Sequence, residues 1–244
     1  MKKSRIVTFV ISLSVALSAC SGNVVLKQEN KQVLPEQSTI NEQAEDYTLL
    51  YGDTLNSIYR FILNEENEED MTHIREAALA LGDEAVNKIG YRFSDLTGDD
   101  IPELIIGLSD KPESAYTKNE IYAVYTLKDN IPVLALEGRS RSAYSLTENN
   151  GFFYHGSNGA AYSIFGEYHL SDNAALVCDN YYFTYPDAEN PAEMEIFYNT
   201  TGKWDKETSD KTDMNLDEFL AKEEKMAQKT INIEFMSFAE MNIT

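Results

Sequence analysis

The sequence predicts an α+β fold, in which N-terminal helices pack on an antiparallel β-meander, followed by one late helix and a closing strand. Before residue 90 the apolar residues repeat with helical spacing, and after it they alternate with a period of two. Turn-forming residues separate the short alternating runs, so neighbouring strands are expected to pair with one another. The predicted domain, 46–244, has a length of about 200 residues, which is ordinary for one domain.

Residues 1–19 have the pattern of a signal peptide. A cationic start precedes the apolar segment 6–17, which is too short to span a membrane. The residues that follow, Leu17-Ser18-Ala19-Cys20, resemble the lipobox of bacterial lipoproteins, whose signal peptidase cuts before a lipid-modified cysteine. This resemblance implies that Cys20 carries the lipid and begins the mature chain. The alternative is ordinary secretory cleavage, with Cys20 incidental.

Residues 20–45 are predicted to form a flexible tether. This stretch is rich in Gln, Asn, Glu and Ser and has too few large apolar residues to build a core. As a flexible coil it would hold the domain about 25–30 Å from the bilayer.

The acidic composition limits the partners of the chain. The net charge is −21, and removing three of the 20 cationic residues with the signal peptide leaves 17 against 41 acids, or about −24. Such a charge repels nucleic acid and anionic lipid alike. Attachment to a membrane is therefore expected only through the N-terminal lipid, on the extracytoplasmic face of the cell membrane.

Two helices are expected before residue 90. The first covers about 46–64, and the acidic run 64–70 separates it from the second, where it would act as a solvated cap. Gly90 is placed as the C-terminal stop of the second helix. The apolar stripes are Tyr47, Leu50, Tyr51, Leu55, Ile58 and Ile62 in the first helix, and Ile74, Ala78, Leu81, Ala85 and Ile89 in the second.

Nine strands are expected after Gly90, with Asn150-Gly151 as a type I′ hairpin turn. A late helix over about 216–228 begins with Asn215 and Glu218 in the spacing of a capping box. The segment 231–238 alternates and is predicted to be a closing strand. The nine strands are 91–94, 104–108, 121–127, 133–137, 143–146, 152–155, 162–170, 176–185 and 194–198.

The acidic stretch 95–107, DLTGDDIPELIIG, lies between the first two predicted strands. Calcium takes six to eight oxygen ligands, which alternate residues of a tight loop can supply. The stretch resembles the calcium loops of integrin-type FG-GAP repeats, and also a D-x-x-G-D-G-x-P-E-L segment of uncharacterised lipoproteins of Gram-positive bacteria. The resemblance implies a calcium site. Its ligands, at alternate positions, would be Asp95, Thr97, Asp99, the carbonyl of Ile101, and Glu103.

Two residues depart from this pattern. Asp100 stands where glycine is usual, and Thr97 offers a hydroxyl where Asp or Asn is usual. An EF-hand is disfavoured, because its twelfth position, which should carry a bidentate acid, is Ile106. The alternative to a calcium site is a polar turn with solvated acids.

Other candidate residues give weaker signals. Cys178 ends an apolar run predicted to be a buried strand, so we expect an unreactive thiol rather than a nucleophile. His155 and Ser157 could serve a hydrolase, but a turn between two strands is favoured there. The three histidines His73, His155 and His169 lack zinc-site spacing. Aromatic residues, 15 of them tyrosines, could stack on sugars but are common on any sheet.

Three classes of function remain open. The favoured one is a membrane-tethered extracellular binding or adhesion module with a calcium loop. The alternatives are an extracellular hydrolase acting on wall or peptide substrates, and a structural envelope lipoprotein. We expect a non-catalytic role, because no convergent catalytic set is visible in the sequence.

Overall fold

The computed structural model describes most of the chain beyond the predicted tether. The described ranges are 47–63, 71–109, 119–139, 141–159, 162–190 and 193–241. The predicted signal peptide, Cys20, the tether and the acidic run 64–70 lie outside them. Within these ranges, no helix has both the length and the apolar character needed to cross a membrane.

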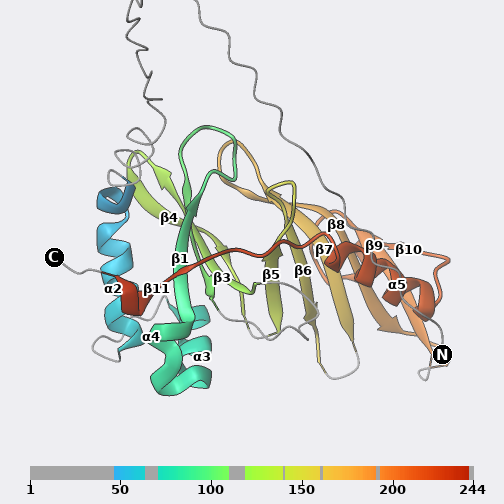
Figure 1. Cartoon of the computed structure of the whole chain (residues 1–244). Helices are drawn as coiled ribbons and strands as arrows, with labels where there is room; N and C mark the ends of the chain where they lie inside the picture. Colours follow the sequence, from blue (N-terminus) through green and yellow to red (C-terminus); the bar gives the residue numbers. More distant parts are fainter. Residues whose placement is uncertain are drawn as a thin grey trace, which may run out of the picture.

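The described strands form one antiparallel sheet (Figure 1). Its order is β10-β9-β8-β7-β6-β5-β3-β2-β1-β11, and β4 pairs with β3 beside this path. The strands are β1 Ile89–Ser94, β2 Glu103–Leu108, β3 Ile121–Lys128, β4 Ile131–Glu137, β5 Ser142–Leu146, β6 Phe152–Ser157, β7 Ser163–Leu170, β8 Leu176–Pro186, β9 Met194–Asn199, β10 Asp210–Lys211 and β11 Met236–Ser237. All nine strands predicted after Gly90 are confirmed, with small shifts at their ends.

The predicted α+β class is wrong. The structure is mainly one large antiparallel sheet of 11 strands, with 41% strand against 28% helix. Short connections let almost every strand pair with its neighbour in sequence, so the meander becomes one wide sheet. The helices are short and cover only parts of this sheet, so they do not make a second layer. They are α2 Gly52–Ile62, α3 Thr72–Leu81, α4 Ala85–Lys88 and α5 Leu216–Ala227.

The second predicted helix does not run to Gly90. It breaks at Gly82, whose φ is +57°, and continues only as a 3₁₀ turn and the short α4. Gly90 lies inside β1, and a Cβ at this position would come within 2.6 Å of the Met236 carbonyl oxygen. The helical stop predicted at Gly90 is therefore wrong, and this glycine instead permits close approach of the C-terminal chain.

Turns and caps show a mixed outcome. The capping box of α5 is confirmed: Asn215 accepts from the Glu218 amide at 3.0 Å, and Glu218 accepts from the Asn215 amide at 2.9 Å. The type I′ turn predicted at Asn150-Gly151 is wrong, because only Asn150 has a positive φ. A two-residue hairpin turn with both φ values positive forms instead at Asp129-Asn130, between β3 and β4.

The closing strand predicted over 231–238 is also largely wrong. Only Met236–Ser237 pair, with β1. We call residues 228–235 the strap, which in Figure 1 runs from the end of α5 across the front of the sheet to β11. Its apolar side chains Ile231, Ile233 and Phe235 pack on the core instead of pairing in a ladder.

The hydrophobic core lies on both faces of the sheet. On β2, Leu104 and Ile106 pack with the N-terminal helices, whereas Ile105 between them belongs to the cluster under the strap. Alternate residues of a strand point to opposite faces, so these two clusters are separated by the sheet. Helix α5 covers a third cluster, in which Phe219 packs with Phe153 and Phe165.

Candidate functional site

Four strand connections meet at one end of the sheet, and we call them the rim. They are residues 95–102, 129–130, 147–151 and 171–175. In Figure 1 the β1–β2 and β7–β8 connections extend from the same end of the sheet, and the Asn150 amide donates to the Asp95 carbonyl at 3.1 Å. Within the described ranges, every residue other than glycine that has a positive φ lies in the rim: Asp100, Asp129, Asn130, Asn150 and Ala174.

The β1–β2 connection, 95–102, is held by its own aspartates. Asp95 accepts from the Gly98 amide at 2.7 Å and from the Asp100 amide at 3.1 Å. Asp99 accepts from the Ile101 amide at 2.9 Å. Asp100 takes the left-handed backbone, φ 65°, that glycine usually provides and that aspartate tolerates better than most residues. Two of the acids therefore shape the loop.

The carboxylate of Glu103, at the start of β2, binds the loop through a hydrogen bond. This glutamate is 1% exposed and accepts from the Leu96 amide at 2.8 Å and the Thr126 hydroxyl at 3.1 Å. Burial raises the pKa of this carboxyl, the charges of Asp99 and Asp95 act in the same direction, and the two hydrogen bonds oppose them. Because Leu96 is itself buried in the cluster under the strap, the loop is anchored to the core.

The two remaining predicted ligands differ from each other. The Thr97 hydroxyl is buried and has no hydrogen-bond partner within the described ranges. Such an atom usually has a protein or solvent partner. The Ile101 side chain is 39% exposed, and a ligand role would fall to its carbonyl oxygen.

A cavity of about 450 Å³ opens beside this loop. The structure brings Thr97 and Asp99 to its wall, whereas Asp95, Ile101 and Glu103 are not among its lining residues. Thr126 lines the cavity, and its hydroxyl donates a hydrogen bond to the Glu103 carboxylate behind it. The full lining consists of Thr97, Asp99, Thr126, Leu127, Lys128, Asp129, Asp172, Asn173 and Ala174.

The acids of the rim do not form a ready metal-binding group. No cluster of three or more His, Cys, Asp or Glu residues that could hold a metal ion is found within the described ranges. The backbone hydrogen bonds of Asp95 and Asp99 fit the polar-turn alternative, whereas the unpartnered Thr97 hydroxyl fits a loop that receives a ligand.

Sequence reasoning missed the other rim residues. Asp129 and Asp172 join the cavity from the β3–β4 and β7–β8 turns, far from residue 95 in the chain. The turn dipeptide Asp129-Asn130 was a local signal for a hairpin. Nothing local indicated that the sheet would bring this hairpin to the acidic loop.

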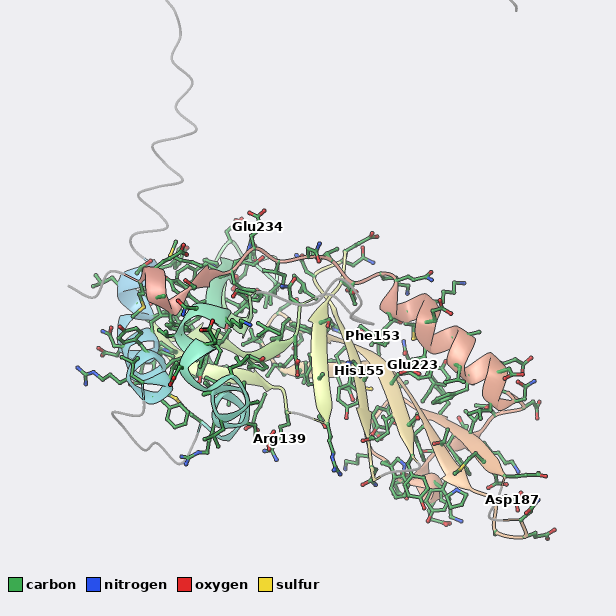
Figure 2. The ribbon with its side chains drawn as sticks, turned by 60° about the horizontal axis from the view of Figure 1, so that its bottom comes forward. Arg139, Phe153, His155, Asp187, Glu223 and Glu234 are labelled. Atoms are coloured by element: carbon green, nitrogen blue, oxygen red, sulfur yellow. The ribbon has the colours of Figure 1, made fainter. Side chains whose placement is uncertain are left out.

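The hydrolase candidates lie on β6. The strand continues through Gly156 to Ser157, so His155 and Ser157 share a face and the predicted turn is wrong. The imidazole of His155 stacks on Phe153, with ring centroids 6.0 Å apart and an interplanar angle of 20°. Figure 2 shows both residues on the part of the sheet beside α5, away from the N-terminal helices.

Cys178 lies on β8, which confirms the prediction that it belongs to a strand. Its side chain is half-buried and packs against the cluster under the strap. Burial raises the pKa of this thiol, the charge of Asp179 raises it further, and a hydrogen bond with Tyr168 opposes them. Because the thiolate is the reactive form, this environment favours an unreactive thiol.

Comparisons of the chain with protein-family models, curated proteins and solved structures find no match. The functional argument therefore rests on the sequence and on the geometry of the rim.

Proposed function

We propose that the protein is a lipid-anchored, extracytoplasmic binding module and that the rim is its binding surface. The observation that carries this proposal is the open cavity of about 450 Å³, which is lined by the end of β3 and by three connections distant in sequence. Its volume lies within the range of small-molecule sites, about 300–1,000 Å³. Loops on a rigid sheet are a frequent location for binding residues.

The membrane anchor is proposed from the lipobox-like residues 17–20. The high negative charge of the mature chain leaves little other attraction to a membrane. We expect Cys20→Ser to move the protein from the membrane fraction to a soluble or unprocessed form. Cys178→Ser is the matched control and should leave the partition unchanged. Membrane partition of Cys20→Ser equal to that of the unmutated protein would contradict the anchor.

Calcium binding at the β1–β2 loop is the second part of the proposal. The residues that would hold the ion are Asp95, Thr97, Asp99, the Ile101 carbonyl and Glu103. The left-handed Asp100 and the unpartnered Thr97 hydroxyl support this. Bound calcium would supply positive charge among carboxylates that otherwise repel one another. Because the described acids are not gathered for a metal, we expect weak binding.

The calcium test is a melting experiment. For a weak extracellular site, with Kd around 10⁻⁴–10⁻³ M, about 1 mM calcium adds roughly 0.4–1.4 kcal/mol, a melting shift of roughly 1–6 °C. Asp99→Ala should abolish the shift, and the cost of losing its hydrogen bond with the Ile101 amide should be the same with and without calcium. Glu193→Ala, which removes an exposed acid outside the rim, should retain it. Equal melting temperatures of the unmutated protein in calcium and in chelator would contradict the site.

A further inference from the structure

Strand β4 has one edge that pairs with no strand of the described ranges. It pairs with β3 along Ala123–Lys128, whereas β5 meets β3 only at Ile121. Figure 1 shows β4 apart from β5, on the side of the sheet that carries α2. An unpaired edge presents backbone amides and carbonyls with which another strand can pair. The outermost strands β10 and β11 are only two residues long, so β4 offers the longer free edge.

The side chains of β4 are apolar and exposed on both faces of the strand. Ile131 is 63% exposed, Val133 36% and Leu134 39%. Because Val133 and Leu134 are consecutive, they point to opposite faces, so neither face of β4 is fully covered here. Single exposed apolar residues are ordinary, but three within four residues of an unpaired strand indicate an interaction surface.

The hairpin register decides which backbone groups point outward. Lys128 and Ile131 flank the two-residue turn and lie opposite each other, so their backbone groups bond to one another. Residues then alternate, so Val133 also bonds to β3, whereas Pro132 and Leu134 direct their backbone groups to the free edge. Pro132 has no amide to offer, as is usual for proline on an edge. Leu134 is therefore the outward residue, before the register shift that follows it, with both a donor and an acceptor.

We propose that β4 pairs with β4 of a second copy of this chain, in antiparallel orientation about a two-fold axis at Leu134. The two Leu134 residues would lie opposite each other and exchange both backbone hydrogen bonds. Pro132 and the register shift keep the ladder short, so the exposed apolar side chains supply much of the contact. Because both copies use the same edge, the assembly closes as a dimer. This inference goes beyond the binding function proposed for the rim and does not depend on it.

The charges along this edge favour a second copy. The chain has a net charge of −21, but the segment 128–139 has two cations, Lys128 and Arg139, and two acids, Asp129 and Glu137, and so is neutral. Antiparallel pairing brings the start of one strand to the end of the other, so Asp129 approaches the partner's Arg139. Exposed charges more than about 8 Å apart are largely screened at physiological salt. Two acidic copies can therefore meet at this edge without strong repulsion.

Disulfide trapping tests the two-fold axis. Opposed residues that exchange both hydrogen bonds have Cα atoms about 5.5 Å apart, a separation that a disulfide spans. The parent is the full chain with Cys178→Ser, to which Leu134→Cys is added. The control is Val177→Cys, a residue of similar exposure, 37%, on β8, whose two edges are both paired. Cells that express each chain are oxidised before extraction.

We expect Leu134→Cys to give a covalent product of twice the chain mass, and the parent and Val177→Cys to give little of it. The absence of this product from Leu134→Cys, or an equal yield from Val177→Cys, would overturn the inference. A product in which Leu134→Cys is joined to a different protein would also overturn it, because the occupant of the edge would then not be a second copy.

Sedimentation of the purified full chain in detergent tests the apolar contact. Leu134→Lys places like charges opposite each other at the axis and should raise the dimer dissociation constant at least about tenfold. Ile131→Lys, at the most exposed β4 residue, should also weaken the dimer and serves if the first variant folds poorly. Leu220→Lys, at a leucine of α5 that is 47% exposed, should change the constant by no more than about twofold. A monomeric unmutated chain, or a dimer that both β4 variants leave unchanged, would overturn the inference.

Discussion

The N-terminal helices and α5 cover different parts of the same sheet, and they bury polar groups in opposite ways. Under the N-terminal helices, the hydroxyl of the fully buried Tyr51 lies 3.1 Å from the Pro102 carbonyl and 3.2 Å from the Tyr125 carbonyl. On α5, the carboxyl of Glu223 is partly buried and has no partner within the described ranges. Figure 2 shows Glu223 on the side of α5 that faces the sheet.

This difference affects how each region responds to pH. Burial raises the pKa of Glu223 from 4.5 to about 7, because it disfavours the charged form and no donor within the described ranges compensates for it. Burial also raises the pKa of Tyr51, but its neutral hydroxyl is already paired and does not titrate near pH 7. A buried polar group with partners therefore costs little, whereas one without them makes stability depend on pH.

The largest expected effect tests the packing of α5. Phe219 is fully buried, and its ring lies 4.7 Å from that of Phe165. Phe219→Ala should lower the free energy of unfolding by about 3–5 kcal/mol, since it leaves a cavity under the helix. Leu220→Ala, on the same helix but 47% exposed, should change it by no more than about 0.5 kcal/mol. Denaturant titration measures both, and similar losses would contradict the observed packing.

The second prediction concerns the pH dependence of stability that Glu223 causes. Since the folded-state pKa of Glu223 is raised, its contribution to stability is full below about pH 4.5 and is lost as pH rises to about 7. Glu223→Gln should therefore gain about 1–3 kcal/mol relative to the unmutated protein above pH 7. The gain should vanish below pH 4.5. Glu224→Gln, at an exposed neighbour, is the control, and a pH-independent difference for Glu223→Gln would refute the prediction.

The smallest effect concerns the paired hydroxyl. Tyr51→Phe should cost about 1–2 kcal/mol, because a buried hydrogen bond is lost. The cost should be the same from pH 5 to pH 9. Tyr47→Phe, which removes an exposed hydroxyl 3.2 Å from the Asp100 carbonyl, should cost less. Thermal melts at several pH values test this, and a strongly pH-dependent cost would mean that the two regions do not differ as described.

Local patterns were sufficient for most secondary structure. The nine strands after Gly90 and the capping box of α5 follow from alternation and from Asn215 and Glu218, because those interactions lie between near neighbours in the chain. The conformation of the acidic loop also depends on local interactions, since Asp95 and Asp99 accept hydrogen bonds from backbone amides no more than five residues away.

The sequence by itself therefore determined nine of the strands, the capped late helix and the position of the acidic loop between β1 and β2. Tertiary structure alone decided that these strands make one wide sheet, that Gly90 serves close packing, and that the strap forms an isolated bridge from Thr230 to Thr147 instead of a strand. It also decided that Asp129 and Asp172 share a cavity with Thr97 and Asp99. These outcomes depend on contacts between residues far apart in the chain, which no local spacing records. The burial of the Glu103 and Glu223 carboxyls was likewise decided by tertiary structure, because burial is set by the whole fold.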